Sequence, residues 1–422
     1  MNISDLFIKR PVMTSLVMLA VMLFGVFAYR LLPVNDLPNI DFPTIQVTSN
    51  LPGASPETMA SAVATPLERQ FSTISGLDSM TSTNGQGVSI ITLKFALERD
   101  IDAAAQDVQA AISMAARQLP QDMPSPPSYR KVNPADQPVL YLALSSPTLP
   151  LSDVNEFGDT IIAPRVSMIS GVAQVLVYGS QKYAVRVQLD PQLLANRKIG
   201  IDEVSAALAR WNINLPTGGL QGDKQAFTIQ ATGQLYNAEA FKPMIVTYRE
   251  GSPVRLQDIA MVVDSVENDK IAAWYSSGGK STRAIVLAIQ RQPGTNTIEV
   301  VDSIKKQIPG FRSQLPGNVQ LNILFDRTES IRASVADVKF TLVLTIALVI
   351  LVIFLFLRNL SATVIPSLAL PLSIIGTFAA MYGLGFSVNN ITLMALTLSV
   401  GFVVDDAIVM LENIVRHMEH GE

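Results

Sequence analysis

The sequence predicts an α+β membrane protein, in which transmembrane helices are joined to a large aqueous segment of split-βαβ (ferredoxin-like) units with one inserted domain. Three observations support this fold class. Four long stretches carry almost no charge, although the chain contains 31 basic and 35 acidic residues and its mean hydropathy is +0.33. Residues 33 to 335 alternate strand and helix patterns of the soluble type. Residues 182 to 266 interrupt the second of two similar patterns, which then resumes.

The four apolar stretches are long enough to cross a bilayer, because a helix of about 20 residues spans its hydrocarbon core. The first stretch follows Lys9 and Arg10. Its length favours an uncleaved span over a secretory signal, whose apolar region is only about 7–15 residues long. We therefore expect transmembrane helices over residues 12–32, 340–357, 364–384 and 391–414.

Basic residues next to the spans predict their orientation, because short cytoplasmic loops are enriched in Lys and Arg. One side of the predicted bundle carries Lys9, Arg10, Arg358 and Arg416, whereas the loop of residues 385–390 on the other side has no charge. Arg30 and Lys339 lie on that other side, but they adjoin the large aqueous segment, where the bias weakens. Both chain ends are therefore predicted to be cytoplasmic, with residues 33 to 335 outside the cytoplasm.

The first half of the aqueous segment has the order of a split βαβ unit. Ser55 and Pro56 mark a helix start, because serine caps and proline fits the first helical position. The predicted strands cover 44–49, 80–83, 88–95 and 139–144, and the predicted helices cover 55–71 and 100–119. The second half repeats this order from residues 139–144 or their neighbours, with a helix at 151–169, strands at 171–178, 283–290 and 319–325, and a helix at 297–315.

The interrupting residues 182 to 266 are predicted to form a separate small domain with a strand at 184–189 and a helix at 201–211. It contains the glycine-rich segment Leu215 to Asp223. Two interpretations of this segment stay open: the tip of a hairpin, or a loop that packs on a neighbouring subunit.

The last apolar stretch contains two adjacent carboxylates, Asp405 and Asp406, and residues 391 to 400 before them carry no charge. A charge in the hydrocarbon region costs several kcal/mol, so an acidic pair there indicates proton or cation handling. The alternative is a pair near the cytoplasmic end whose carboxylates reach water.

Other chemistry is not predicted. The net charge of −4 argues against a nucleic-acid partner, and the chain has no cysteine. Residues 277–282 resemble the end of a nucleotide-binding loop, but Trp274 stands where that pattern requires glycine, so a hairpin turn is expected. The only histidines, His417 and His420, lie in a charged tail, which favours a solvated helix end over a metal site. With no histidine in the aqueous part, no nucleophile–base pair can be assembled, so an enzyme is not expected.

Several motifs together resemble one family. They are Phe7-Ile8-Lys9-Arg10-Pro11, Pro52-Gly53-Ala54-Ser55-Pro56-Glu57, and Gly401-Phe402-Val403-Val404-Asp405-Asp406-Ala407-Ile408-Val409 with Glu412-Asn413. With the doubled split-βαβ plan they make the whole chain resemble the resistance-nodulation-division (RND) transporters. The drug-exporting branch, in particular the MdtB and MdtC type, fits best.

The resemblance implies a pump subunit of the bacterial inner membrane with a large periplasmic part. Residues 1–32 would form the cytoplasmic N-terminal end and first transmembrane helix, and 38–133 the first porter subdomain. The remaining parts would be the second porter subdomain (134–180 and 270–330), the docking-domain insert (181–269), transmembrane helices two to four (336–415) and a cytoplasmic end (416–422).

The resemblance also implies roles for residues. Asp405 and Asp406 match the family's intramembrane aspartates, which take up and release protons in each cycle. The metal-exporting branch typically has one aspartate there, so the pair favours drugs and amphiphiles as substrates. The positions that match the family's drug pocket are Val139, Tyr141, Tyr178, Asn268, Ile271 and Phe325, with valine at 139 in place of the phenylalanine of the best-known members. Ordinary sheet and core residues would show the same alternation, which is the alternative.

The glycine-rich loop would reach into the next protomer through Pro216, Gly218, Gly219 and Gly222, although it is shorter than in the best-known relatives. The expected partners are a homo- or hetero-trimer of RND subunits, a periplasmic adaptor protein and an outer-membrane channel. The expected function is proton-driven multidrug efflux that contributes to antibiotic resistance, with no metal and no cofactor besides the proton gradient.

Length separates this chain from the family pattern. Family members have two similar halves of six spans each, and these 422 residues correspond to the first half up to its fourth span. A fragment, a truncated product and one piece of a split transporter are all compatible with this length. The cationic partner of the acidic pair would lie in the second half, so the chain alone is not expected to transport. The other function class is a membrane scaffold or ligand-binding protein that does not transport.

Overall fold

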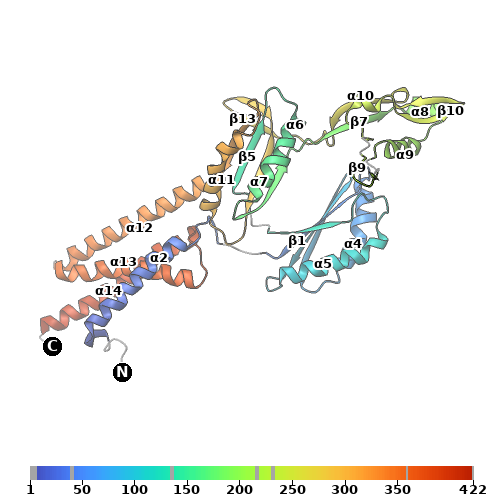
Figure 1. Cartoon of the computed structure of the whole chain (residues 1–422). Coiled ribbons are helices and arrows are strands. Elements are labelled where there is room, and N and C mark those ends of the chain that lie inside the picture. The colour runs from blue at the N-terminus through green and yellow to red at the C-terminus, as the bar shows by residue number, and fades with distance from the viewer. Residues whose placement is uncertain are drawn as a thin grey trace.

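The computed structural model describes residues 7–38, 42–133, 137–213, 218–229, 233–357 and 360–420. Figure 1 shows the long helices at one end of the molecule, units of sheet and helix beyond them, and a smaller unit at the far end. The start of α2 and the end of α14 lie at the same end of the helix bundle (Figure 1), as the predicted orientation requires.

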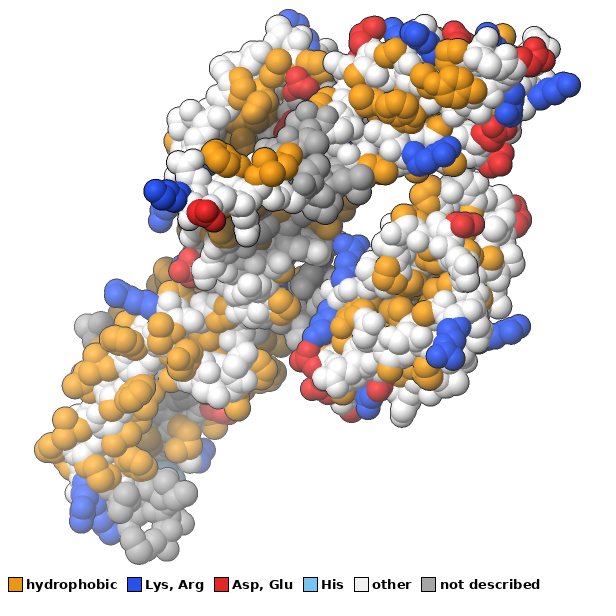
Figure 2. Space-filling model, turned by 45° about the vertical axis from the view of Figure 1, so that its right-hand side comes forward, with side chains coloured by type: hydrophobic (Ala, Val, Ile, Leu, Met, Phe, Trp, Pro, Cys, Tyr) orange, Lys and Arg blue, Asp and Glu red, His pale blue; other side chains and the backbone are white. Residues whose placement is uncertain are grey.

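The bundle consists of α2 (Pro11–Leu31), α12 (Arg327–Leu357), α13 (Leu360–Gly383) and α14 (Asn390–His420). All four are long and apolar enough to cross a membrane, by length and composition, and they lie where the four spans are predicted. Hydrophobic side chains are spread along the bundle surface seen in Figure 2. Helix α12 begins at Arg327, well before the predicted start at Phe340, because its first turns are charged and continue directly from a strand.

Helices α2 and α13 pack at very short range. A Cβ atom placed on Gly25 would lie 2.0 Å from the carbonyl oxygen of Ile375, and one on Gly376 would lie 2.9 Å from the Val21 side chain. Small residues allow helix backbones to approach in this way inside a membrane. These two helices therefore form one tightly packed pair within the bundle.

The first aqueous unit has a four-stranded antiparallel sheet in the order β2-β3-β1-β4, covered on one face by helices. Its strands are β1 (Thr44–Asn50), β2 (Leu77–Gly85), β3 (Val88–Phe95) and β4 (Ser128–Val132). Its helices are α3 (Pro56–Thr58), which continues through a π-helical turn (Met59–Ala64) into α4 (Thr65–Phe71), and α5 (Ile101–Ala115), followed by a 3₁₀ turn (Ala116–Gln118).

The fourth strand of this sheet differs from the prediction. Residues 139–144 were expected to complete the first unit, but β4 occupies that position and pairs with β1. Strand β4 was not predicted because it is a short, exposed edge strand that contains Arg130 and Lys131 and follows three prolines.

The second unit has a four-stranded antiparallel sheet in the order β16-β5-β15-β6. Its strands are β5 (Leu140–Ser145), β6 (Val172–Tyr178), β15 (Ile285–Arg291) and β16 (Gln320–Asp326). Its helices are α6 (Leu151–Glu156), a π-helical turn (Phe157–Ile162), α7 (Ala163–Ser167) and α11 (Thr297–Arg312). Alternate residues of the central strands pack against these helices and form the core, among them Leu140, Leu142, Leu144, Ile285, Leu287 and Ile289.

The insert between β6 and β15 has a core of its own. It contains β7 (Tyr183–Leu189), α8 (Pro191–Arg197), α9 (Ile201–Trp211), β8 (Gly219–Gln221), β9 (Ala226–Thr228), α10 (Ala238–Phe241), β10 (Ile245–Arg249), β11 (Ser252–Arg255), a 3₁₀ turn (Leu256–Asp258) and β12 (Ala260–Val266), which pairs with β7. A hairpin of β13 (Trp274–Ser277) and β14 (Lys280–Arg283) follows. Gly278 and Gly279 both have positive φ, as such a two-residue turn requires, so the predicted hairpin is confirmed.

The insert contains a titratable contact that can be tested. The Tyr183 hydroxyl donates to Asp264 Oδ1 at 2.5 Å, and this hydrogen bond, with burial and the carboxylate charge, raises the pKa of Tyr183 to about 12. The pKa in an unfolded chain is about 10. The contact should therefore stabilise the insert fully below about pH 10 and lose this contribution as the pH rises to about 12.

We expect the Tyr183→Phe variant to lack this alkaline loss of stability, because no phenol proton remains to be released. The first measurement is the phenolate absorbance of the wild type minus that of the variant as the pH rises, which isolates the titration of Tyr183. The second is thermal unfolding of both proteins across the same pH range. A difference titration centred near pH 10 would contradict the assigned contact.

Candidate functional site

The second sheet has one face that its own helices do not cover. Strand register defines this open face, because Tyr141 pairs with both Phe325 and Ala288, and Val286 pairs with Tyr178. Directly paired residues point to the same side of a sheet. The open face thus carries Tyr141 and Ala143 on β5, Val286, Ala288 and Gln290 on β15, Gln174, Leu176 and Tyr178 on β6, and Phe325 on β16.

Aromatic rings occupy both sides of the open face. The rings of Tyr141 and Phe325 meet edge to face, with centroids 6.1 Å apart. Tyr178 stands near the opposite side, on β6, where it pairs with Val286. The small Ala288 lies between Tyr141 and Leu176 in the sheet register. Tyr178 and Phe325 are 49% and 52% exposed. Exposed aromatic side chains on a sheet face indicate a surface that binds apolar groups.

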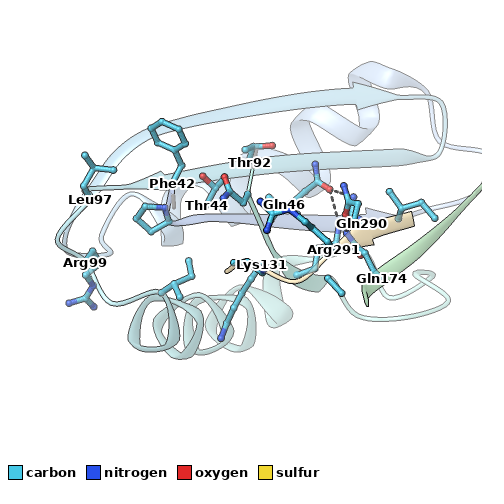
Figure 3. Close-up of a pocket in the computed structure, with 18 of the residues that line it drawn as sticks. Phe42, Thr44, Gln46, Thr92, Leu97, Arg99, Lys131, Gln174, Gln290 and Arg291 are labelled. Atoms are coloured by element: carbon cyan, nitrogen blue, oxygen red, sulfur yellow. Dashed lines mark hydrogen bonds between the residues drawn. The ribbon is translucent and has the colours of Figure 1, made fainter. Parts of the chain in front are cut away.

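The β6 side of the open face continues into a cleft of about 750 Å³ between the two sheets. This volume lies in the range of small-molecule sites, about 300–1,000 Å³. Figure 3 shows Gln46, Gln174 and Gln290 gathered in the cleft with Arg291 beside them, and Phe42 and Leu97 farther along. Other lining residues are Thr44, Thr92, Ile101, Val132, Ala173, Leu176 and Tyr178.

Cationic side chains border the cleft, each with a described partner. Arg99 pairs with Asp107 at 2.6 Å, and Lys131 pairs with Asp102. The guanidinium of Arg130 donates to the neutral Gln46 Oε1, through Nη2 at 2.5 Å and Nε at 3.0 Å.

The cleft therefore combines apolar surface with amide and guanidinium donors. Amides both donate and accept hydrogen bonds, so such a lining suits amphiphilic ligands of varied shape.

Three of the six predicted pocket residues, Tyr141, Tyr178 and Phe325, come together on the open face. Val139 does not, since it is 3% exposed and belongs to the core on the helix side. Asn268 and Ile271 lie in the segment between β12 and β13, where their carbonyl oxygens accept hydrogen bonds from Gln181 Nε2 at 3.1 and 2.7 Å.

Sequence reasoning missed the polar residues of the cleft, in particular Gln46, Arg130, Gln174 and Gln290. The alternation Gln174-Leu176-Tyr178 along β6 was the available signal, because all three residues fall on the face of Tyr178. The contribution of β1 and β4 could not be found in this way, because it depends on how the two sheets lie beside each other.

The acidic pair lies on α14, and both carboxylates are exposed in the described chain. Asp405 is 15 residues beyond the first residue of α14, about 22 Å along the helix at 1.5 Å per residue. A hydrocarbon layer of about 30 Å that began at Asn390 would include this depth. Neighbouring Val400 and Val403 pack in an apolar cluster with α12 and α13. Among the ion pairs of the described residues, none includes Asp405 or Asp406.

The glycine-rich segment forms the hairpin β8–β9 in its described part. Gly218, Gly219 and Gly222 lie in or beside this hairpin, whereas Pro216 lies outside the described residues. Leu220 and Phe227 face each other across the hairpin and are exposed. Packing of this hairpin on a neighbouring subunit stays a prediction.

The sequence pattern of the AcrB/AcrD/AcrF family matches residues 3–422. The chain belongs to the AcrB/AcrD/AcrF family. This confirms the RND resemblance over the whole chain. AcrB/AcrD/AcrF proteins are RND-type transporters, not enzymes, and generally export drugs and other substrates. The chain is therefore a transport protein, and its four candidate spans indicate a membrane protein.

Proposed function

We propose that this chain is part of a proton-driven exporter of drugs and amphiphilic compounds in the bacterial inner membrane. We place it in the drug-exporting branch, of the MdtB and MdtC type. The observation that carries the proposal is the carboxylate pair inside an apolar helix, because a scaffold or ligand-binding protein has no need of two acids in such a segment.

The pair suits proton coupling for an electrostatic reason. Two adjacent carboxylates in a low-dielectric layer repel each other strongly if both are charged. Binding or release of one proton therefore changes the energy of this helix segment substantially. A cation supplied by another part of the transporter would favour the charged state, and alternation between the two states could drive a change in helix packing.

The open face and the cleft suit the proposed substrates. Aromatic rings and apolar side chains can bind the apolar part of an amphiphile, while the glutamines and Arg130 can bind its polar part. We propose that the subunit works as a homo- or hetero-trimer with a periplasmic adaptor and an outer-membrane channel, and that export contributes to antibiotic resistance. The exposed hairpin β8–β9 is the proposed contact with the next protomer.

Transport in liposomes tests the function directly. The membrane protein that contains this chain should move an amphiphilic dye when a pH gradient is imposed, and an uncoupler should stop this movement. Dye movement of the same rate with and without the gradient would contradict proton coupling.

We also expect a defined topology, and the absence of cysteine makes it easy to test. An impermeant thiol reagent should label single cysteines at the exposed Gln86 and Gly222 in intact spheroplasts, because residues 33 to 335 are proposed to be periplasmic. A cysteine at the exposed Arg416 is the matched control and should be labelled only after lysis. The reverse pattern would invert the proposed orientation.

A further inference from the structure

A cluster of polar contacts joins the helix bundle to the second sheet, far from the acidic pair. Its centre is Asp36, in the segment that follows α2. Asp36 Oδ2 accepts a hydrogen bond from Arg327 Nη2 at 3.0 Å, and its Oδ1 accepts one from Asn390 Nδ2 at 3.1 Å. Arg327 is the first residue of α12, and Asn390 is the first residue of α14. One carboxylate therefore connects the starts of two membrane helices.

Backbone contacts reinforce this connection. Val34 and Val388 form a parallel β-bridge. The N–H of Val388 donates to Pro33 O at 2.9 Å, and the N–H of Asn35 donates to Val388 O at 3.0 Å. The loop before α14 is thus held against the segment that carries Asp36.

The same segment is fastened to the helix layer of the second sheet. The N–H of Thr297, at the start of α11, donates to Val34 O at 3.2 Å. The Asn35 side-chain amide lies 2.8 Å from the hydroxyl of Thr297, and both residues are buried. We call this set of contacts, made by residues 33–36, Thr297, Arg327, Val388 and Asn390, the joint.

Helix α12 follows directly on the second sheet, because β16 ends at Asp326 and α12 begins at the next residue. Asp326 Oδ1 accepts from the N–H and hydroxyl of Thr328 at 2.8 and 2.6 Å, which caps the helix start. Lys305 of α11 forms an ion pair with the same carboxylate. Burial raises the pKa of Asp326, but the hydrogen bonds from Lys305 and Thr328 outweigh it and lower the pKa below its usual value, so the ion pair persists at neutral pH.

The Asp36–Arg327 pair is also better shielded than an ordinary surface pair. The side chains of Arg327 and Asp36 are 22% and 33% exposed. Arg327 is fixed further by Gln137 Oε1, which accepts from Nη1 at 3.0 Å, and by its own N–H, which donates to Val139 O at 3.1 Å. Removing the carboxylate would leave Arg327 and Asn390 without their common acceptor.

We infer that Asp36 is a positioning residue that fixes the first turn of α14 to the second sheet, so that rearrangements at Asp405 and Asp406 reach the sheet that carries the open face. The acidic pair and Asn390 lie on one continuous helix. A change of packing at the pair must therefore move the start of α14, and the joint passes that movement to β16 and α11. The expected effect on efflux rests on the proposed export function. The fixing of α14 to the second sheet rests only on the contacts of the joint.

Efflux kinetics test the consequence. In the complete transporter, Asp36→Ala should lower the maximal rate of dye efflux by about tenfold, within the usual range of coupling between sites, while the dye concentration at half-maximal rate stays unchanged. The exchange of charges, Asp36→Arg with Arg327→Asp, should restore most of the rate. Asp302→Ala is the matched control, because it breaks the exposed Arg332–Asp302 pair between α11 and α12 without touching α14. Equal rates in Asp36→Ala and the wild type would overturn the inference.

A distance measurement tests the mechanism without relying on transport. Spin labels on cysteines at Met394 of α14 and Met168 beside α7, both exposed, report how firmly α14 is held to the second unit. We expect one narrow distance distribution in the wild type and in Asp302→Ala, and a clearly broader one in Asp36→Ala. An unchanged distribution in Asp36→Ala overturns the inference even if export proves to be proton-driven. A broader distribution in Asp36→Ala supports the joint even if export proves not to be proton-driven.

A disulfide distinguishes a fixed joint from one that must open. Val34→Cys with Val388→Cys places two thiols at bridge partners, within the Cα separation that a disulfide spans. Oxidation should narrow the distance distribution again in the Asp36→Ala background and leave wild-type efflux intact. Loss of efflux on oxidation, reversed by reduction, would show that the contact opens in each cycle and would overturn the inference.

Discussion

Replacing either carboxylate of the α14 pair, as Asp405→Asn or Asp406→Asn, is expected to reduce uncoupler-sensitive efflux in the complete transporter by about a hundredfold or more. A positioned group that transfers protons commonly contributes at least this factor. Asparagine has almost the same size as aspartate but cannot bind and release a proton, so packing of α14 and ligand binding should stay close to wild type. Efflux rate, protein level and dye affinity are measured on the same preparations.

A carboxylate elsewhere in the bundle provides the comparison for this pair. Asp337 lies in the polar first turns of α12 and is exposed. Asp337→Asn should leave efflux within about twofold of wild type, because this carboxylate lies outside the apolar region. Normal efflux in both variants of the pair would remove the proton-relay role.

Alanine at Tyr178 or Phe325 is expected to change which compounds are exported, by about fivefold or more for large aromatic compounds and much less for small ones. Each ring is about half exposed on the open face, so a ligand that lies there loses stacking and apolar contact when the ring is removed. For the same reason folding should be little affected. Drug susceptibility across a panel of compounds, with protein level measured in parallel, gives the result.

The core residue Leu142 offers a matched comparison on the same sheet. Its side chain is fully buried on the helix side, so Leu142→Ala should cost about 2–5 kcal/mol of stability and reduce the amount of folded protein. Its compound pattern, corrected for protein level, should stay unchanged. If Tyr178→Ala and Phe325→Ala behave like Leu142→Ala, their side chains serve the core and not a binding surface.

The helices and most strands could be predicted from the sequence because their patterns are local. Apolar length identifies the four candidate spans, alternation identifies strand β1, and a short apolar run identifies strand β15. Strand β4 escaped prediction because an exposed edge strand with Arg130 and Lys131 shows no apolar alternation. The start of α12 was placed late, because an aqueous helical extension of a membrane helix has no apolar signal.

The candidate sites differ in the same way. Asp405 and Asp406 are visible in sequence because two neighbouring charges stand in one apolar run. The open face needed the register, since Tyr141 and Phe325 are far apart in the chain and meet only as strand partners. The joint was beyond prediction, because Asp36 and Asn390 are 354 residues apart and each looks like an ordinary polar residue at a helix end.

The attachment of the insert has a consequence for how this protein can vary. Tyr183 and Val266 are direct partners in the β7–β12 ladder, and the N–H of Glu267 donates to Lys182 O at 2.8 Å, so the chain leaves and returns at one point. The insert also has its own core. A domain of different length or shape can therefore replace the insert between residues 182 and 267. The entropic cost of closing the chain between these two points rises only slowly with the length of the inserted segment. Evolution can in this way remodel the far end of the molecule while the second sheet keeps its register and its open face.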